Sequence, residues 1–171
     1  PLDYERVLII TSRVSYSTSI LHRYNESGLK FNYYKDKDIK LTECDRLVIQ
    51  LESLYKIMIE GDILPFDLII LDECESIYNQ FLSSTFLKSN NKIRNIDCYK
   101  KVIKMSKIVI LMDAFITKRT IKTIELFRDN KVIFINNLYR KNKLIFKELE
   151  EKTNTTNKNG KIIKEAEEIT I

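Results

Sequence analysis

The chain has 171 residues, 44% of them hydrophobic and 31% charged, which is enough for one domain with a core of its own. Its net charge of +5 is compatible with a nucleic-acid partner but does not require one. Three widely spaced cysteines and one histidine do not supply the four close ligands of a structural zinc site. The lack of a long apolar run predicts no membrane partner, and the free thiols predict an intracellular location, in the nucleus or the cytoplasm.

Short apolar runs alternate with amphipathic stretches along most of the chain. In chain order the sequence predicts a strand at 6–11, a helix at 15–26, strands at 31–34 and 47–50, a helix at 53–59 closed by Gly61, a strand at 66–71, helices at 73–87 and 96–105, a strand at 107–112, a helix at 117–128 and a strand at 131–135. Thr117 is expected to cap the helix that follows it, with its hydroxyl accepting a hydrogen bond from a free backbone N–H. The polar stretch 150–160, between apolar stretches at 144–149 and 161–164, predicts either a strand pair around a loop or a linker.

This alternation predicts an α/β fold, a three-layer sandwich with a mainly parallel sheet whose apolar strands are covered on both faces. Functional residues in such sheets lie at the carboxyl ends of the strands. Four predicted strands deliver polar groups to that edge: Thr11, Ser12 and Arg13; Gln50 with Glu52 and Ser53 beyond it; Asp72 and Glu73; and Asp113 and Ala114 with Thr117 beyond them. Loops after strands are polar in any protein. Asp113 alone, or the Thr-Ser pair alone, is therefore explained as well by a helix cap as by a ligand contact.

The adjacent carboxylates of Asp72 and Glu73 are harder to explain structurally. They follow the apolar run Leu68–Leu71, and burying them in a crevice is costly unless a cation or hydrogen-bond donors offset their charge. In nucleoside-triphosphate hydrolases the first acid of such a pair anchors Mg²⁺, usually through water, and the second orients the attacking water. Many α/β proteins contain such a pair by chance, so the pair alone indicates only a possible Mg²⁺ site.

Four motifs in order resemble superfamily-two helicases, and most of all the replication-origin-binding helicases of herpesviruses, large DNA viruses and related mobile or fungal sequences. The resemblance covers about residues 6–140 and is carried by VLIITSR at 7–13, LVIQLESL at 47–54, DLIILDECES at 67–76 and ILMDA at 110–114. It implies a P-loop NTPase (RecA-like) helicase lobe that uses ATP and Mg²⁺ and binds DNA, either single strands or an origin duplex. It also implies a role in the initiation of DNA replication.

The resemblance implies a role for each matching residue. Asp72 resembles the acid that anchors Mg²⁺ through water, and Glu73 resembles the acid that activates water. Glu75 and Ser76 complete that motif and link it to neighbouring motifs. The residues that resemble DNA-contacting elements are Thr11, Ser12, Arg13, Gln50, Glu52 and Ser53. Those that resemble the element coupling hydrolysis to strand movement are Asp113, Ala114 and Thr117, although the Ser-Ala-Thr form common in other helicases is absent.

The chain departs from this family in two respects. It has glycine only at positions 28, 61 and 160, so the Gly-x-Gly-Lys-Thr/Ser phosphate loop and the strand before it are missing. The second helicase lobe, with its arginine finger, is also missing. We therefore expect residues 1–140 to be a truncated ATPase lobe and residues 141–171 a connector toward that second lobe. We expect this polypeptide alone not to hydrolyse ATP at a useful rate.

Two other functions remain open at this level. One is a non-catalytic nucleic-acid-binding module from a decayed helicase, and the missing glycine-rich loop favours it. The other is a Mg²⁺-dependent nuclease that uses Asp72, Glu73 and Asp113. The aromatic residues Tyr33, Tyr34, Tyr78 and Phe81 are expected in the core or on the surface rather than stacked on bases. Cys74 is expected to pack as a small apolar residue.

Overall fold

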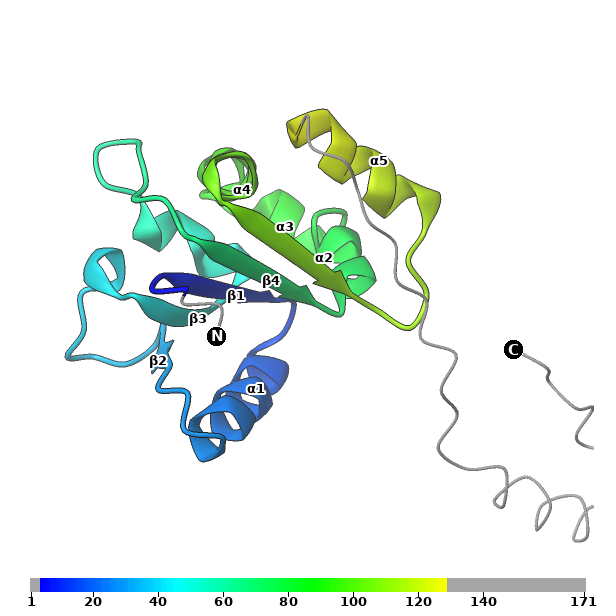
Figure 1. The fold of residues 1–171 in the computed structure, drawn as a ribbon. Helices are drawn as coiled ribbons and strands as arrows, with labels where there is room; N and C mark the ends of the chain where they lie inside the picture. The colour runs from blue at the N-terminus through cyan, green and yellow to red at the C-terminus, as the bar shows by residue number, and fades with distance from the viewer. Residues whose placement is uncertain (1–3, 129–171) are drawn as a thin grey trace, which may run out of the picture. The chain divides into compact units, whose positions relative to one another are not determined.

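A five-stranded parallel sheet lies at the centre of the computed structural model, which describes residues 4–128 (Figure 1). Its strands are β1 (Val7–Thr11), β2 (Asn32–Tyr33), β3 (Arg46–Gln50), β4 (Leu68–Asp72) and β5 (Ile108–Met112), in the order β2-β3-β1-β4-β5. This confirms the predicted α/β class and parallel sheet. The strand predicted at 131–135, the segments beyond it and the predicted boundary at residue 140 lie outside the described residues.

Helices cover both faces of the sheet. Helix α1 (Val14–Glu26) lies on one face (Figure 1). The other face carries η2 (Leu51–Ile57), α2 (Cys74–Gln80), α3 (Ser84–Lys88), α4 (Lys92–Met105) and α5 (Lys118–Phe127), and a short 3₁₀ helix, η1 (Leu41–Glu43), precedes β3. In β1, Leu8 and Ile10 point into the larger core, whereas Ile9 packs with Ile20 of α1. The prediction that the first strand is buried on both faces is therefore confirmed.

The helix predicted at 53–59 is a 3₁₀ helix that begins at Leu51 and ends at Ile57. Its buried residues Leu51, Leu54 and Ile57 recur every third position, which matches the three residues per turn of a 3₁₀ helix. Gly61 does not close this helix. It lies at φ +89° in a tight turn that bridges Ile59 and Asp62.

The single helix predicted at 73–87 is two helices. Helix α2 ends at Gln80, and Ser83 caps α3 because its hydroxyl accepts a hydrogen bond from the Phe86 N–H at 3.1 Å. Helix α4 begins at Lys92, four residues before its predicted start, and this extension places Asn95 on its buried face.

Strand β5 was predicted to be fully buried, and this is wrong for the described residues. Val109 and Leu111 pack against the larger core, but Ile108, Ile110 and Met112 on the opposite face are exposed. Strand β5 is the edge strand of the described sheet, and α1 packs near β1 and β3 instead. One apolar face of β5 is therefore uncovered by residues 4–128.

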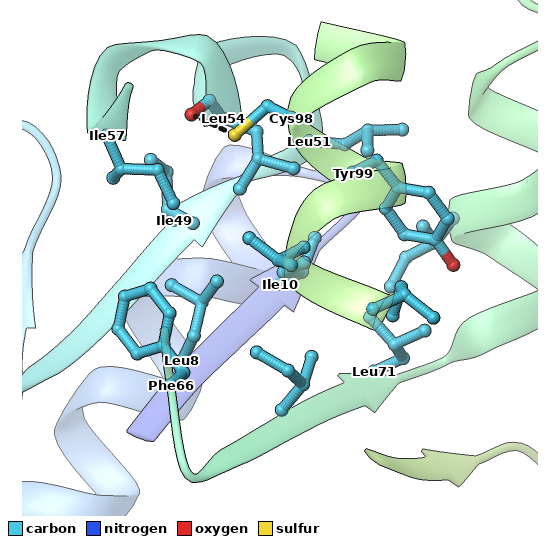
Figure 2. Packing of buried hydrophobic residues seen from close by; sticks show 14 of the residues in the cluster. Leu8, Ile10, Ile49, Leu51, Leu54, Ile57, Phe66, Leu71, Cys98 and Tyr99 are labelled. Atoms are coloured by element: carbon cyan, nitrogen blue, oxygen red, sulfur yellow. Dashed lines mark hydrogen bonds between the residues drawn. The ribbon is translucent and has the colours of Figure 1, made fainter. Parts of the chain in front are cut away.

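The larger core contains aromatic and cysteine side chains, among them Tyr99 and Cys98 (Figure 2). Tyr78 and Phe81 pack with Tyr99, as predicted for core residues. Cys98 donates from Sγ to the Leu54 carbonyl at 3.4 Å. Cys74 is fully buried, and burial, with the nearby charges of Asp113 and Glu75, raises the pKa of its thiol to about 12. This thiol is a packing group with little thiolate character.

The described part of the chain has no helix with the length and apolar character needed to cross a membrane.

Candidate functional site

The pairing of the strands aligns their carboxyl ends along one edge of the sheet. Thr11 of β1 is opposite Gln50 of β3, and Asp72 of β4 is opposite Met112 of β5. Since β1 and β4 are also neighbours, the polar groups that follow β3, β1, β4 and β5 lie in that order along the edge. All four predicted motifs therefore reach the same edge of the fold.

The acidic half of this edge lies beyond β4 and β5. A depression of about 580 Å³ is lined by Asp72, Glu73, Ser76, Met112, Asp113 and Ala114. Five of these six residues belong to the predicted site, and the structure brings them together. Asp72 is half-buried and accepts a hydrogen bond from the Glu73 N–H at 3.1 Å, while the Glu73 side chain is exposed.

Tyr16 of α1 borders the same acidic pair, and sequence reasoning missed it. Burial, together with the negative charges of Asp72 and Glu73, raises the pKa of the Tyr16 hydroxyl. A tyrosine within an amphipathic helix gives no sequence signal of this proximity, because it depends on how α1 crosses the sheet. Tyr16 therefore lies beside the site as a neutral hydroxyl.

Glu73 has an unusual backbone conformation. It lies in the left-handed region, at φ 56° and ψ 52°, at the start of α2. For a residue with a Cβ atom this conformation costs about 1–2 kcal/mol. The strain falls on one of the two acids predicted to act chemically, where stored strain is typical of functional residues.

Replacing Glu73 by Gly is expected to raise the free energy of unfolding by about 0.5–1 kcal/mol, because glycine adopts the left-handed region without strain. Chemical denaturation measures this change. Glu73→Ala is the matched control, since it removes the same carboxylate but keeps the Cβ atom, and it should give no such gain. Equal stability of the two variants would show that the Glu73 backbone is unstrained.

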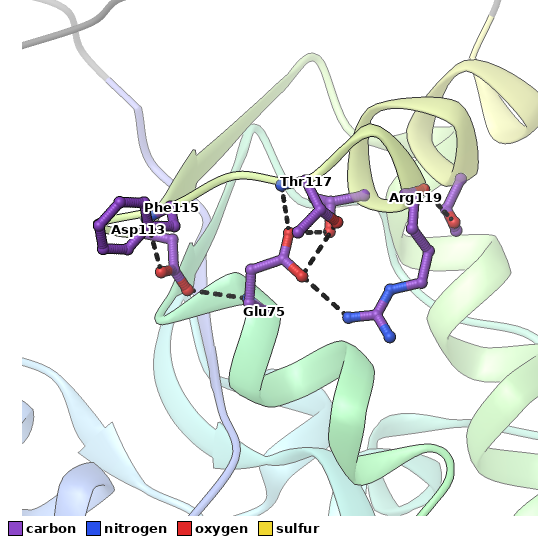
Figure 3. A network of polar contacts seen from close by, with 7 residues as sticks. Glu75, Asp113, Phe115, Thr117 and Arg119 are labelled. Carbon is purple, nitrogen blue, oxygen red and sulfur yellow. Dashed lines mark hydrogen bonds and ion pairs between the residues drawn. The ribbon is translucent and has the colours of Figure 1, made fainter.

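Glu75 joins α2 to the start of α5 (Figure 3). Its carboxylate accepts hydrogen bonds from the Thr117 N–H at 2.7 Å, the Thr117 hydroxyl at 3.1 Å, the Arg119 guanidinium at 2.8 Å and the Thr120 hydroxyl. Burial alone would raise the pKa of Glu75, but these hydrogen bonds outweigh it and lower that pKa. Glu75 is therefore held ionised between two helices.

Asp113 completes the link from the other side. Its carboxylate accepts hydrogen bonds from the Glu75 N–H at 2.9 Å and from the Phe115 N–H at 3.2 Å (Figure 3). Glu75 thus accepts hydrogen bonds from the segment after β5 with its carboxylate and donates one to that segment with its backbone N–H. Thr117 stands at the N-cap position as predicted, but the predicted capping bond is wrong because its hydroxyl bonds to Glu75 instead.

The other half of the edge follows β1. The Thr11 side chain is fully buried, and its hydroxyl lies 2.5 Å from that of Ser17, so it positions α1 and does not face solvent. Ser12 is also buried, and its Oγ has no hydrogen-bond partner among residues 4–128. Arg13 is exposed at the start of α1. Of the three predicted DNA contacts in this motif, only Arg13 presents its side chain to solvent.

The segment after β3 is tied to its surroundings. The Gln50 amide accepts a hydrogen bond from the Tyr34 hydroxyl at 2.9 Å and donates to the Ser12 carbonyl at 3.3 Å. Glu52 accepts a hydrogen bond from the Gln80 amide, and Ser53 is half-buried nearby. These side chains build the surface between β3 and α2, and Gln50 uses both its amide oxygen and its amide nitrogen in these contacts.

Among residues 4–128, no group of three or more His, Cys, Asp or Glu side chains is placed to hold a metal ion. The three-carboxylate site that a nuclease would need from Asp72, Glu73 and Asp113 is therefore not formed in this part of the chain. The Asp113 carboxylate is occupied by two backbone N–H groups instead.

The chain has a parallel α/β sheet with polar groups gathered at its carboxyl edge, which is the edge where α/β domains commonly bind ligands. This chain belongs to the family described as "Origin of replication binding protein", whose model matches residues 3–145.

Its relatives are viral replication proteins. It is 33% identical over 136 residues to the replication origin-binding protein of human herpesvirus 6A, a match covering 78% of this chain and 16% of the relative. It is 31% identical over 130 residues to the protein of that name from varicella-zoster virus (strain Dumas), covering 74% and 15%. It is also 30% identical over 141 residues to a putative helicase/primase complex protein of African swine fever virus (isolate Warthog), covering 80% and 12%.

This chain thus spans about one sixth or less of the relatives it matches. No solved structure matches it.

Proposed function

We propose that this chain is part of the ATP-dependent helicase lobe of a replication origin-binding protein that acts in the initiation of DNA replication, inside the cell in the nucleus or the cytoplasm. The observation that carries the proposal is the convergence of Asp72, Glu73, Ser76 and Asp113 in one depression at the carboxyl edge of a parallel sheet. The names of the viral relatives support a role in replication. In this proposal, the DNA backbone lies over the Arg13 side of the edge, and ATP with Mg²⁺ lies over the acidic depression.

The residues present fit Mg²⁺ in one way. Mg²⁺ prefers oxygen ligands and keeps several of its waters, so a half-buried carboxylate such as Asp72 suits it as a single, water-mediated contact. When bound with ATP, the ion supplies positive charge that stabilises the transferring phosphate. Asp72 would hold the ion through water, and Glu73 would orient the attacking water.

A triphosphate needs more than this edge provides. Backbone N–H groups of a glycine-rich loop normally cradle the phosphates, but the two glycines in the described residues lie elsewhere, Gly28 after α1 and Gly61 in the turn before β4. In this proposal the phosphate-binding loop and the second lobe come from outside these 171 residues.

The Glu75 network suits a coupling role. It connects the acidic pair on β4 and α2 to the loop after β5 and to α5 through at least five hydrogen bonds. A change at the nucleotide would thus reach the start of α5 without passing through solvent. We assign this coupling to Glu75, Asp113 and Thr117. Ala114 and Ser76 line the depression beside them.

Binding of the 171-residue chain to a fluorescein-labelled dT12 oligonucleotide tests the DNA side. We expect affinity to fall steeply as salt rises, with a slope of log K against log salt of about −0.7 per phosphate contacted. Arg13→Ala should weaken binding and make that slope shallower by about 0.7–1. Fluorescence anisotropy measures both quantities.

Arg23→Ala is the matched control, because Arg23 is also exposed on α1 but lies at its far end. An equal loss in both variants would contradict a specific role for the Arg13 edge and indicate a diffuse charge effect. Cleavage of the oligonucleotide in the presence of Mg²⁺ would favour the nuclease alternative.

A further inference from the structure

Phe115 is the most exposed aromatic side chain at the functional edge. It lies in the loop between β5 and α5, and 69% of its surface is accessible. Single exposed apolar side chains are common on folded domains, but an aromatic ring beside a candidate site is a candidate contact. Figure 3 shows its ring at the outer end of the loop, beside Asp113 and away from Arg119.

The backbone on both sides of this ring is fixed. The Phe115 N–H donates to Asp113 at 3.2 Å, the next residue, Ile116, packs against the larger core, and the Thr117 N–H donates to Glu75 at 2.7 Å. These contacts hold the backbone of Phe115 beside the depression. Because this backbone is already ordered, binding at the ring need not order the loop.

The charge around Phe115 limits what can bind there. Asp72, Glu73 and Asp113 line the adjacent depression, and where no cation offsets their charge these carboxylates repel phosphate groups. A nucleobase carries no charge at neutral pH, and its flat face stacks on an aromatic ring with a gain of about 1–3 kcal/mol per base. An unpaired base satisfies both the exposed ring and the acidic neighbourhood, whereas a backbone phosphate does not.

We propose that Phe115 is a stacking platform for an unpaired nucleobase of single-stranded nucleic acid held at this edge. This inference rests on the proposed DNA-binding function and assigns the base, as distinct from the phosphate, to the β5 end of the edge. In this arrangement Arg13, beyond β1, contacts the backbone, and Phe115, two strands away beyond β5, contacts a base. The bound strand would then contact the loop that Glu75 and Asp113 hold in place.

The absence of tryptophan from the sequence allows a direct test. Phe115→Trp places the only indole of the 171-residue chain at this position, and stacking on a base should quench its fluorescence. The titrants are dT12, an abasic 12-mer with the same number of phosphates, and AMP. We expect quenching by dT12 and none by the abasic 12-mer. Leu126→Trp is the matched control, because Leu126 is 81% exposed on α5, and its indole should respond to neither oligonucleotide.

Affinity gives the second measurement. Phe115→Leu keeps an apolar side chain but removes the aromatic face, and it should weaken dT12 binding about 5- to 150-fold while leaving binding of the abasic 12-mer unchanged. If Phe115→Leu binds dT12 as tightly as the wild-type chain, or if only AMP quenches the indole, the inference is overturned and the proposed function stands. If the wild-type chain binds neither oligonucleotide, both the inference and the DNA-binding function fail.

Discussion

Replacing Glu75 by Gln is expected to lower the free energy of unfolding by about 2–3 kcal/mol. The carboxylate accepts four hydrogen bonds from α5 and the residue before it, one of them from Arg119, and its side chain is only 14% exposed. Hydrogen bonds to charged groups contribute about 1.5–3 kcal/mol each at most, and an amide can replace only part of this set. Urea denaturation at neutral pH measures the change.

Glu125→Gln is the matched control, because Glu125 is an exposed glutamate on α5. It should change stability by less than about 0.5 kcal/mol. Thr120→Val removes one buried donor to Glu75 at nearly constant volume, so a double-mutant cycle with Glu75→Gln should show a coupling energy of about 1 kcal/mol. Additive effects would mean that Thr120 and Glu75 do not interact.

The same network predicts a pH dependence. Because the pKa of Glu75 is lower in the folded chain than its ordinary value of 4.5, its stabilising contribution is fully present above about pH 4.5. That contribution is lost as the pH falls through the folded-state pKa, where the carboxylate is protonated. Glu75→Gln should therefore flatten the decline in stability below pH 4.5. Glu125→Gln should leave the decline unchanged.

Asp67 contributes a second acid-sensitive contact at the opposite end of β4. The Arg6 N–H, the Lys107 ammonium and the Glu5 N–H all bond to its carboxylate, and the hydrogen bond from the Arg6 backbone lowers its pKa most. Part of the acid sensitivity will thus remain in Glu75→Gln. The difference between Glu75→Gln and wild type, rather than the whole pH profile, isolates the network that we propose for coupling.

The sheet, and the edge where the polar motifs gather, could be predicted from sequence because short β-branched runs leave few alternatives. Residues 7–11 and 46–50 are too short for helices and too apolar for loops, and parallel pairing then carries their ends to one edge. The acidic pair at the end of β4 followed from the same logic. What placed these residues together was the alternation of strands and helices, which the sequence displays directly.

The missed features depend on contacts between segments far apart in the chain. Glu75 was expected to link motifs, but its partners Arg119 and Thr120 lie more than 40 positions away, and nothing local identifies them. The exposed face of β5 was missed because an apolar strand in the middle of a sheet and one at its edge have the same composition. The break at Ser83 was detectable, since serine is a preferred N-cap residue.

The second large effect is expected at Asn95, which attaches η2 to α4. Its amide donates to the Glu52 carbonyl and accepts from the Tyr55 N–H, both at 2.8 Å, and the residue is fully buried. Asn95→Ala removes both bonds and leaves two backbone groups unpaired, each at a cost of about 1–3 kcal/mol. We therefore expect a loss of about 2–4 kcal/mol in the free energy of unfolding.

Asn79→Ala is the matched control, because Asn79 is exposed on α2, and its effect should stay below about 0.5 kcal/mol. Hydrogen exchange at the Tyr55 amide locates the damage, since Asn95 is its acceptor. Faster exchange there in Asn95→Ala would show that η2 has come loose, and unchanged exchange would contradict this account. Because η2 carries Glu52 and Ser53, a loosened η2 should also weaken dT12 binding, which connects a buried amide to the proposed DNA-binding edge.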